Sequence, residues 1–271
     1  MKKNRAFLKW AGGKYPLVEE IRRYLPAGDR LIEPFVGAGS VFLNTEYDNY
    51  ILADINSDLI NLYNIVKTNT DDFIRDSRKL FTDEMNTSEV FYVLRSEFNL
   101  CTDAYRRALL FLYLNRHCYN GLCRYNMRGE FNVPFGRYKK PYFPEEELHW
   151  FAQKAKNAIF VCEHYHQTLT QAERGSVVYC DPPYAPLSAT ANFTAYHTSN
   201  FNNNDQQNLA QLAYQLSVEN NIPVLISNHD TLLTREWYQG ASSLYVVMAR
   251  RTISRNISGR SKVNELLALY R

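Results

Sequence analysis

The fold of this 271-residue chain is decided by the stretch Leu31-Ile32-Glu33-Pro34-Phe35-Val36-Gly37-Ala38-Gly39-Ser40. Its first residues end a short apolar strand, and Val41-Phe42-Leu43 opens a helical pattern. Two glycines between a strand and a helix allow a tight turn and a close approach of the backbone to a ligand. A second apolar run, Tyr50-Ile51-Leu52-Ala53, ends at Asp54. The segment therefore predicts a strand, a helix and a second, parallel strand.

The same segment indicates a nucleoside-binding turn. An acidic residue at the end of the second strand, here Asp54, commonly binds the hydroxyl groups of a ribose. Phe42 stands where a dinucleotide-binding sequence has its third glycine, which disfavours close passage of a pyrophosphate over the helix. We therefore expect a nucleoside ligand without phosphates. An ordinary strand-to-helix turn without a ligand is the alternative.

A second motif, Asp181-Pro182-Pro183-Tyr184, follows the apolar run Val177-Val178-Tyr179-Cys180, where a buried strand is expected to end. The Asp181 carboxylate can accept a hydrogen bond from an amine N–H. Two successive prolines restrict the backbone and can direct the Pro182 carbonyl at a second amine hydrogen. The flat ring of Tyr184 can stack on a base. The alternative is a polar turn after a strand, because Asp and Pro are common turn residues.

Charge and composition favour one kind of partner. The length and the 45% of hydrophobic residues predict one large domain or a domain with a sizeable insertion. The net charge is only +3, but residues 95–140 contain nine Lys or Arg against three acidic residues, with nine Phe or Tyr between them. Residues 250–262 contain five Lys or Arg and no acidic residue. Such basic stretches are typical of a nucleic-acid surface, although a solvated basic face is the alternative.

The chain has five cysteines: Cys101, Cys118, Cys123, Cys162 and Cys180. Their odd number and the lack of a Cys-x-x-Cys pair indicate neither a disulfide framework nor a zinc site, so we expect reduced thiols and no metal. The N-terminal residues reach Lys9 before an apolar segment develops, so no signal peptide is expected. No stretch approaches the roughly 20 apolar residues of a membrane span.

Apolar runs predict strands over residues 31–34, 51–54, 159–162, 177–180, 224–227, 245–249 and 266–270. Their alternation with helices predicts a mostly parallel sheet, and the last two runs, which have no helix between them, predict an antiparallel hairpin. The middle of the chain has apolar residues at helical spacing, including a buried helix at 109–114. It continues into a Gly- and Arg-rich loop system with a hairpin turn at 127–130. A polar loop is expected over 200–207.

The motifs occur in an order that resembles the DNA adenine-N6 methyltransferases. The shared motifs are Lys9-Trp10-Ala11-Gly12-Gly13-Lys14, Glu33 to Ser40, Asp54 and Asp181 to Tyr184, and the resemblance runs from Met1 to Tyr270. It is closest to the Dam family, the GATC-methylating enzymes of enteric bacteria. The stretches that carry this closer resemblance are Asn115-Arg116, Tyr119 to Asn126 and Gly129 to Gly136.

The resemblance implies a Rossmann-like α/β sheet of the S-adenosylmethionine-dependent methyltransferases. Residues 1–58 and 161–271 would form the catalytic domain, and residues 59–160 an inserted, mostly helical DNA-recognition domain containing a β-hairpin. The implied reaction is methyl transfer from S-adenosylmethionine to N6 of adenine in double-stranded GATC, by base flipping and direct in-line attack. The implied partner is double-stranded DNA, and the enzyme is expected to be a cytoplasmic, nucleoid-associated monomer with no membrane contact.

The resemblance also assigns residues to roles. The implied catalytic residues are Asp181, Pro182, Pro183 and Tyr184. The implied cofactor-binding residues are Trp10, Ala11, Gly12, Lys14, Glu33, Pro34, Phe35, Gly37, Gly39, Ser40, Asp54 and Asp181. The implied DNA-binding residues are Lys9, Arg95, Arg116, Tyr119, Asn120, Leu122, Arg124, Asn126, Asn132, Pro134, Arg137 and Tyr138.

Several of these roles can be stated more closely. Arg124 is the expected bidentate ligand of a guanine, and Tyr119 is expected to insert into the gap left by the flipped base. Arg137, like Arg95, Asn126 and Asn132, is expected to contact phosphates. Residues 192–199 are expected to form a lid over cofactor and base.

Three other functions remain open at this point. An N4-cytosine DNA methyltransferase uses the same amine chemistry but more often resembles Ser-Pro-Pro-Tyr at the catalytic motif. A protein or RNA amine methyltransferase resembles Asn-Pro-Pro-Tyr there. A DNA-binding protein with an inactive pocket is the non-enzymatic alternative, which the intact motifs disfavour.

Overall fold

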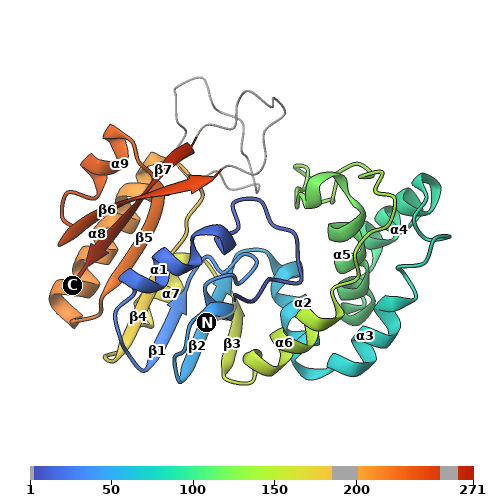
Figure 1. Ribbon diagram of the computed structural model, residues 1–271, viewed down its shortest axis with the longest axis horizontal. Helices are drawn as coiled ribbons and strands as arrows, with labels where there is room; N and C mark the ends of the chain where they lie inside the picture. Colours follow the sequence, from blue (N-terminus) through green and yellow to red (C-terminus); the bar gives the residue numbers. More distant parts are fainter. Residues whose placement is uncertain (1–2, 185–200, 251–261) are drawn as a thin grey trace.

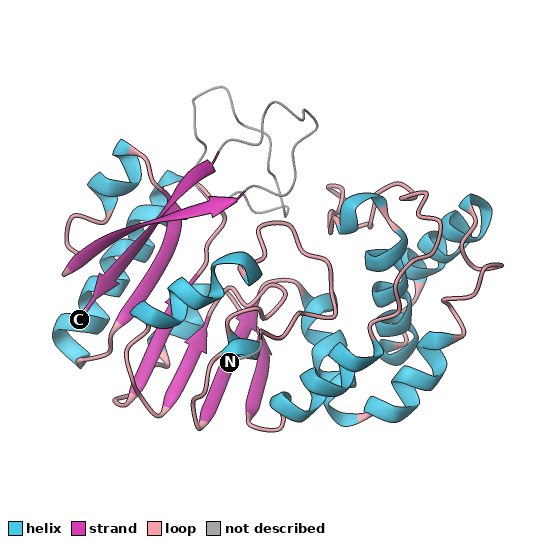
Figure 2. Cartoon of the chain, in the orientation of Figure 1, coloured by secondary structure: helices cyan, strands magenta, loops and turns pink. Residues whose placement is uncertain are grey.

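The computed structural model describes residues 3–184, 201–250 and 262–271, and it is built around a seven-stranded sheet (Figures 1 and 2). The strand order is β3-β2-β1-β4-β5-β7-β6. The strands are β1 (Arg30–Glu33), β2 (Asn49–Asp54), β3 (Ala158–Cys162), β4 (Ser176–Cys180), β5 (Val224–His229), β6 (Ser243–Arg250) and β7 (Lys262–Tyr270).

The direction of the strands follows from the connections between them. The first five strands in the sequence pair in parallel, whereas β7 pairs antiparallel with both β5 and β6. The predicted mostly parallel sheet and the predicted antiparallel pair are therefore confirmed. β7 lies between β5 and β6. The strand that pairs with the parallel part of the sheet is therefore β7, and β6 lies at the edge.

Helices cover both faces of the sheet. The α-helices are α1 (Val18–Tyr24), α2 (Ser57–Thr68), α3 (Thr70–Arg78), α4 (Ser88–Leu100), α5 (Ala104–His117), α6 (Glu145–Ala155), α7 (Tyr165–Thr170), α8 (Asn203–Asn220) and α9 (Leu232–Trp237), and three short 3-10 helices are η1 (Tyr15–Leu17), η2 (Phe42–Asn44) and η3 (Tyr119–Gly121). Successive strand residues belong to opposite cores, as the pleat requires: Leu31 packs in one core and Ile32 in the other. This architecture is the predicted Rossmann-like α/β fold.

Helices α2 to α6 gather beside β3, at the right of Figure 1, and they share one continuous core with the sheet. α2 packs against both β3 and α5, so it belongs to the junction between sheet and helices. The predicted boundary at residue 160 falls inside β3, which pairs with β2 from residue 158 onwards. We therefore propose that the inserted segment ends before Ala158. Within the described ranges no helix is long and apolar enough to cross a membrane.

Two local predictions were wrong for identifiable reasons. The helical pattern at Val41 gives only the 3-10 turn η2, because the Asn44 side chain donates to the Ser40 carbonyl and bridges to Asn4. Such side-chain bonds compete with a continuing helix. The polar stretch predicted as a loop over 200–207 is already helical from Asn203. Asn202 caps that helix reciprocally with Asp205, so its polar residues act as a helix start.

The predicted hairpin turn is confirmed at residues 126–130. The Asn126 carbonyl accepts from the Gly129 N–H, and the Asn126 side chain accepts from the N–H groups of Arg128 and Glu130. Tyr125 and Phe131 face each other across the two arms. We call residues 122–134 the recognition hairpin.

The start of the recognition hairpin is tied to the N-terminal segment. Asn115 at the end of α5 exchanges hydrogen bonds with Lys9, accepting from its N–H at 2.9 Å and donating to its carbonyl at 2.7 Å. Gly121 has a φ of +63° and lies directly against the Lys9 side chain. A side chain at position 121 would therefore push the hairpin and the N-terminal segment apart.

We predict that Gly121→Ala destabilises the protein more than Gly129→Ala. Both glycines have a positive φ, +63° and +75°, so alanine costs roughly 1–2 kcal/mol at either site. At residue 121 the new Cβ would lie 2.2 Å from the Lys9 Cβ, whereas residue 129 has nothing within 4 Å. Overpacking should add about 1–3 kcal/mol at residue 121 alone, measured by urea unfolding. Equal losses in the two variants would contradict this reading of the contact.

Candidate functional site

The predicted motifs meet at one edge of the sheet. Parallel neighbours β2, β1 and β4 end at Asp54, Glu33 and Cys180, and the chain leaves each strand on the same side. In open α/β sheets, ligands bind outside the carboxyl ends of the strands. The sequence thus brings Asp54, the glycine turn after Glu33 and the Asp181-to-Tyr184 loop to the edge where a ligand is expected.

The glycine turn after β1 is braced by Asp54. Gly37 and Gly39 both have positive φ, +47° and +70°, which explains why glycine is needed there. The Gly37 N–H donates to Asp54 Oδ2 at 3.1 Å, and the Asn56 N–H donates to Oδ1 at 3.0 Å. A Cβ on Gly37 would lie 2.9 Å from Trp10 Nε1, so the indole packs directly on the turn. The structure therefore brings Trp10, Gly37 and Asp54 together, as predicted for one ligand site.

An aromatic cluster lies beside this turn. Phe35 stacks on Tyr165 with ring centroids 5.4 Å apart, and Phe201 meets the Phe35 ring edge-on at 5.7 Å. Of these three rings, only Phe35 is predicted from the sequence to lie at the ligand site. Tyr165 comes three residues after β3, at the same edge of the sheet, and its position after a predicted strand was the signal that could have found it.

Glu33 is a buried carboxylate at the end of β1. Its side chain is almost inaccessible, at 2% exposure for the residue, and its Oε1 has no hydrogen-bond partner. Burial, together with the negative charge of Asp181, raises the pKa of Glu33 well above its ordinary value. An unsatisfied buried carboxylate is costly in isolation, so this position suits a cationic group of a ligand.

Asp181 is held by one lysine at the end of β4. Lys14 Nζ lies 2.9 Å from Asp181 Oδ1 and donates to the Gly12 carbonyl at 2.6 Å. The same ammonium lies 4.5 Å from the centroid of the Tyr184 ring. Burial raises the pKa of Asp181 to about 6; Lys14 opposes this rise and Glu265 adds to it. Lys14 was assigned to the cofactor, but in this structure its ammonium is engaged with Asp181 and Tyr184.

Tyr184 is oriented by two residues that the sequence analysis missed. Its hydroxyl donates to Glu265 Oε2 at 2.8 Å, and the His229 ring meets its ring edge-on at 4.7 Å. Glu265 and His229 are direct partners across the β5–β7 pair. An acidic residue just before the apolar run at 266–270 was the available signal for Glu265.

The loop that carries Tyr184 is also tied to α8. Gln206 donates to the Pro183 carbonyl at 2.7 Å and accepts from the buried Asn228 side chain at 3.1 Å. Gln206 itself is 2% exposed. The stretch predicted as a polar loop thus supplies a support for the Asp181-to-Tyr184 loop.

The residues assigned to DNA occupy the other side of the site. Tyr119, Asn120, Arg124, Pro134 and Arg137 are exposed on or near the recognition hairpin. Within the hairpin, Arg124 Nε donates to Asn132 Oδ1 at 2.7 Å, which holds the guanidinium across the two arms. Leu122 is half-buried.

Two basic residues near the hairpin lie over aromatic rings. Lys9 Nζ lies 3.7 Å from the centroid of the Tyr138 ring, and Arg95 lies over Tyr92 at 4.7 Å while donating to the Val133 carbonyl at 3.1 Å. These contacts hold both side chains beside the hairpin.

Two assigned residues are engaged inside the protein. Arg116 is 7% exposed and donates to the carbonyls of Tyr142, at 3.0 Å, and Phe7, at 3.3 Å. Burial removes the guanidinium from the surface that a phosphate would approach, so we propose a structural role for Arg116 in place of the assigned DNA contact. Asn126 uses its side chain to close the hairpin turn and donates to Glu130 at 2.7 Å.

The lid expected at residues 192–199 lies outside the described residues. Among the residues that the structure does describe, no group of three or more His, Cys, Asp or Glu side chains could hold a metal ion.

The chain is similar to known proteins along its whole length. The family model "D12 class N6 adenine-specific DNA methyltransferase" matches residues 10–253. A protein of Serratia marcescens named DNA adenine methylase is 80% identical over the whole of both chains. Proteins with the same name from Escherichia coli strain K12 and from Vibrio cholerae are 68% and 59% identical, each over all of this chain and 97% of its own length.

We predict that Glu265→Gln lowers the pKa of Asp181 below about 6, because a negative neighbour disfavours the carboxylate. Lys14→Met should raise it, because the opposite charge is lost. The measurement is a carbon NMR titration of the Asp181 carboxyl group in the ligand-free protein. Glu173→Gln is the control, since Glu173 pairs with Arg30 at the opposite end of the strands and should leave the titration unchanged. If the pKa of Asp181 is unchanged in Glu265→Gln, the charge of Glu265 does not influence Asp181.

Proposed function

This chain belongs to the D12 class of N6 adenine-specific DNA methyltransferases, and we propose that it methylates N6 of adenine in double-stranded GATC with S-adenosylmethionine as donor. The adenine is flipped out of the duplex, because an atom inside a base pair cannot otherwise be reached. The amine attacks the donor methyl group directly and in line, without a covalent enzyme intermediate. The enzyme is proposed to act as a monomer at the nucleoid.

One observation carries this proposal: the position of the Lys14 ammonium. It is an N–H donor that contacts the Asp181 carboxylate at 2.9 Å and lies 4.5 Å from the centroid of the Tyr184 ring. A flipped adenine needs the same two partners, an acceptor for its amine hydrogen and an aromatic face for its ring. The position of the Lys14 ammonium, beside the Asp181 carboxylate and over the Tyr184 ring, is therefore one that favours a nitrogen hydrogen-bond donor. We propose that the ammonium moves aside when the base enters.

The chemistry requires the amine nitrogen to become a nucleophile. Its lone pair is delocalised into the adenine ring, and hydrogen bonds from both amine hydrogens favour a pyramidal nitrogen with a localised pair. With a pKa of about 6, Asp181 is mostly ionised at neutral pH and can accept one of them. The Pro182 carbonyl is the proposed second acceptor. Catalysis then depends on the positioning of the amine and the methyl group and on preorganised electrostatics.

The residues around the glycine turn fit S-adenosylmethionine. When bound, this donor supplies a methyl group made electrophilic by its sulfonium. The Glu33 Oε1 atom, which has no hydrogen-bond partner, suits the ammonium of the methionine part, and Asp54 suits the ribose hydroxyls. Trp10 and Phe35 provide aromatic faces, which tolerate a nearby cation. The other assigned cofactor residues, Ala11, Gly12, Pro34, Gly37, Gly39 and Ser40, would contribute backbone surface.

Recognition of GATC is proposed to depend on the recognition hairpin. Arg124 is exposed and already oriented by Asn132, as a bidentate contact to a guanine requires. Leu122 and Pro134 would contact a thymine methyl group, and Lys9 a second guanine. Tyr119, with 44% of its surface exposed, would fill the space left by the flipped base.

The proposed reaction predicts that Asp181→Ala loses methyl transfer while the protein stays folded. The substitution removes an amine acceptor at a strand end and leaves the apolar core intact. Single-turnover methylation of an unmodified GATC duplex is the measurement, with thermal unfolding as the folding control. A cytosine-containing duplex without adenine tests the N4-cytosine alternative in the same assay. Near-normal rates in Asp181→Ala would exclude the proposed role of this carboxylate.

Arg124→Ala and Arg137→Ala are predicted to differ in kind. A bidentate base contact provides roughly 1–3 kcal/mol of discrimination, so Arg124→Ala should relax specificity at one base pair. Arg137→Ala should weaken binding to all sequences alike and reduce its salt dependence, as loss of a phosphate contact does. Methylation rates on GATC and its single-base variants, with binding measured at several salt concentrations, distinguish the two. If Arg124→Ala leaves the ratios of the methylation rates on GATC and its variants unchanged, Arg124 contacts the DNA backbone and not a base.

A further inference from the structure

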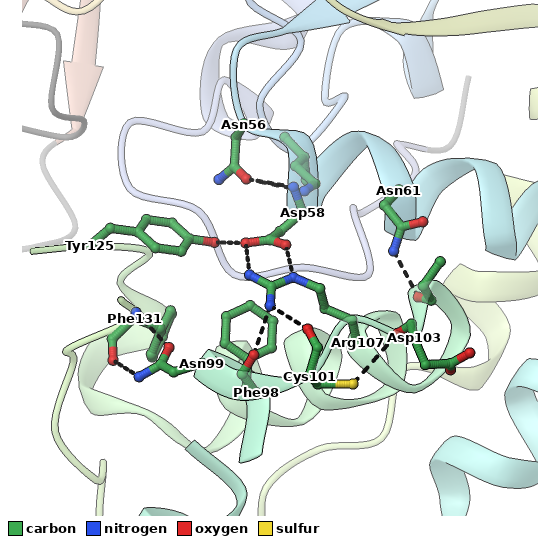
Figure 3. A network of polar contacts seen from close by, with 12 residues as sticks. Asn56, Asp58, Asn61, Phe98, Asn99, Cys101, Asp103, Arg107, Tyr125 and Phe131 are labelled. Atoms are coloured by element: carbon green, nitrogen blue, oxygen red, sulfur yellow. Dashed lines mark hydrogen bonds and ion pairs between the residues drawn. The ribbon is translucent and has the colours of Figure 1, made fainter. Parts of the chain in front are cut away.

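A buried carboxylate on α2 joins three elements that are far apart in the sequence (Figure 3). Asp58 lies in the first turn of α2 and is 7% exposed. Its two oxygens receive the Arg107 side chain of α5 in a bidentate ion pair, and Oδ2 also accepts from the Tyr125 hydroxyl at 2.6 Å. No step of the proposed reaction uses these three residues.

Arg107 anchors this carboxylate to the helices. Its guanidinium donates to the carbonyls of Phe98, at 2.7 Å, and Cys101, at 3.0 Å, where α4 ends, and it lies 4.2 Å from the Phe98 ring centroid. A planar guanidinium with partners on α2 and α4 has little freedom to reorient. The position of Asp58 is therefore rigid with respect to the helical part of the molecule.

Tyr125 fixes the recognition hairpin to Asp58 through its hydroxyl group. Successive residues of an extended strand point to opposite sides. Tyr125 points inward to Asp58 (Figure 3). Its neighbour Arg124 is exposed. From α4, Asn99 holds the other arm through two hydrogen bonds with the backbone of Phe131, at 2.8 and 3.2 Å. The direction of Arg124 thus depends on how Tyr125 is anchored.

The same carboxylate lies four residues after Asp54, at the start of α2. Asp54 braces the Gly37 turn and accepts from the Asn56 N–H, and Asn56 caps α2 by accepting from the N–H groups of Asp58 and Leu59. The Asn56 side chain also lies 3.5 Å from Cys123 Sγ, inside the recognition hairpin. Hydrogen bonds and short backbone segments therefore link Asp54, the proposed ribose-binding residue, to Cys123 and Tyr125, the two neighbours of Arg124.

We propose that Asp58, with Tyr125, is a positioning residue that couples occupation of the cofactor site to recognition of the DNA sequence by the hairpin. This inference rests on the proposed function, because it takes the Gly37 turn as the cofactor site and Arg124 as a base contact. Coupling between two sites is reciprocal: if the cognate sequence tightens cofactor binding, the cofactor tightens cognate binding by the same factor.

The test measures a coupling ratio and not activity. The dissociation constant of S-adenosylhomocysteine, which cannot react, is determined by calorimetry for the enzyme with a GATC duplex and with a duplex changed at one guanine. The ratio of the two constants should be roughly fivefold or more in the wild type. Tyr125→Phe, which removes one hydroxyl and leaves the Asp58–Arg107 pair intact, should lower that ratio by about threefold or more, with one as the lower limit.

Tyr105→Phe is the matched control. Tyr105 lies on α5, and its hydroxyl donates to Asp76 at 3.0 Å, so the substitution breaks the same kind of bond away from the hairpin. It should keep the wild-type ratio. Asp58→Asn, which also removes the charge that pairs with Arg107, should lower the ratio at least as far as Tyr125→Phe does. The two changes should be non-additive in the double variant, because they share the Asp58–Tyr125 contact.

Three results would overturn the coupling. The ratio could equal one in the wild type, it could be unchanged in Tyr125→Phe, or it could fall as far in Tyr105→Phe as in Tyr125→Phe. The proposed function fails separately, if the wild-type enzyme does not methylate adenine in any duplex. If the wild type methylates a sequence other than GATC, that duplex and its single-base variant replace the pair in the measurement. The two failures are then distinguished by the wild-type methylation assay alone.

Discussion

The site depends on one electrostatic constraint: two carboxylates, the buried Glu33 and the partly buried Asp181, lie at the ends of the neighbouring parallel strands β1 and β4. Neither can move away, since each is held by the strand that precedes it. The loss of hydration raises the pKa of both; the charge of Asp181 adds to the rise at Glu33, and the charge of Glu265 adds to the rise at Asp181. Only cations and hydrogen-bond donors can relieve this strain, and Lys14 already does so for Asp181. A site with this charge pattern favours a cationic donor and a neutral amine acceptor, which are the two reactants of the proposed methyl transfer.

The remaining structure keeps this pair in place from several directions. The aromatic cluster at Phe35 and the indole of Trp10 cover one side of the glycine turn. On the other side, Glu265 and Gln206 hold the Tyr184 loop through its hydroxyl and its backbone. Each support comes from a different element, so the geometry of the reacting groups depends on the whole sheet and not on a single loop.

The sequence was sufficient for the sheet and for the motifs, because both depend on local patterns. Apolar runs located the strands around Asp54 and Asp181, and glycines marked a turn that needs positive φ. It did not reveal partners that meet only through the sheet: Glu265 reaches Tyr184 because β7 pairs with β5, and no spacing in the sequence shows that pairing. The structural role that we propose for Arg116 illustrates the opposite case. A basic residue within a motif was assigned to DNA, whereas its surroundings use it to satisfy buried carbonyls. Charge is visible in a sequence, but burial depends on long-range packing.

The place of β7 between β5 and β6 has a consequence for biosynthesis. β7 follows every other described strand in the chain, yet it carries the carboxylate that orients Tyr184 and covers the open edge of β5. Domains form as the chain emerges, from the N-terminus onwards. Until β7 emerges, β5 presents an unpaired edge and Tyr184 lacks its partner, so a nascent chain can build the cofactor turn well before the base-binding position. The proposed base-binding position is therefore complete only when β7, the last described strand, has joined the sheet.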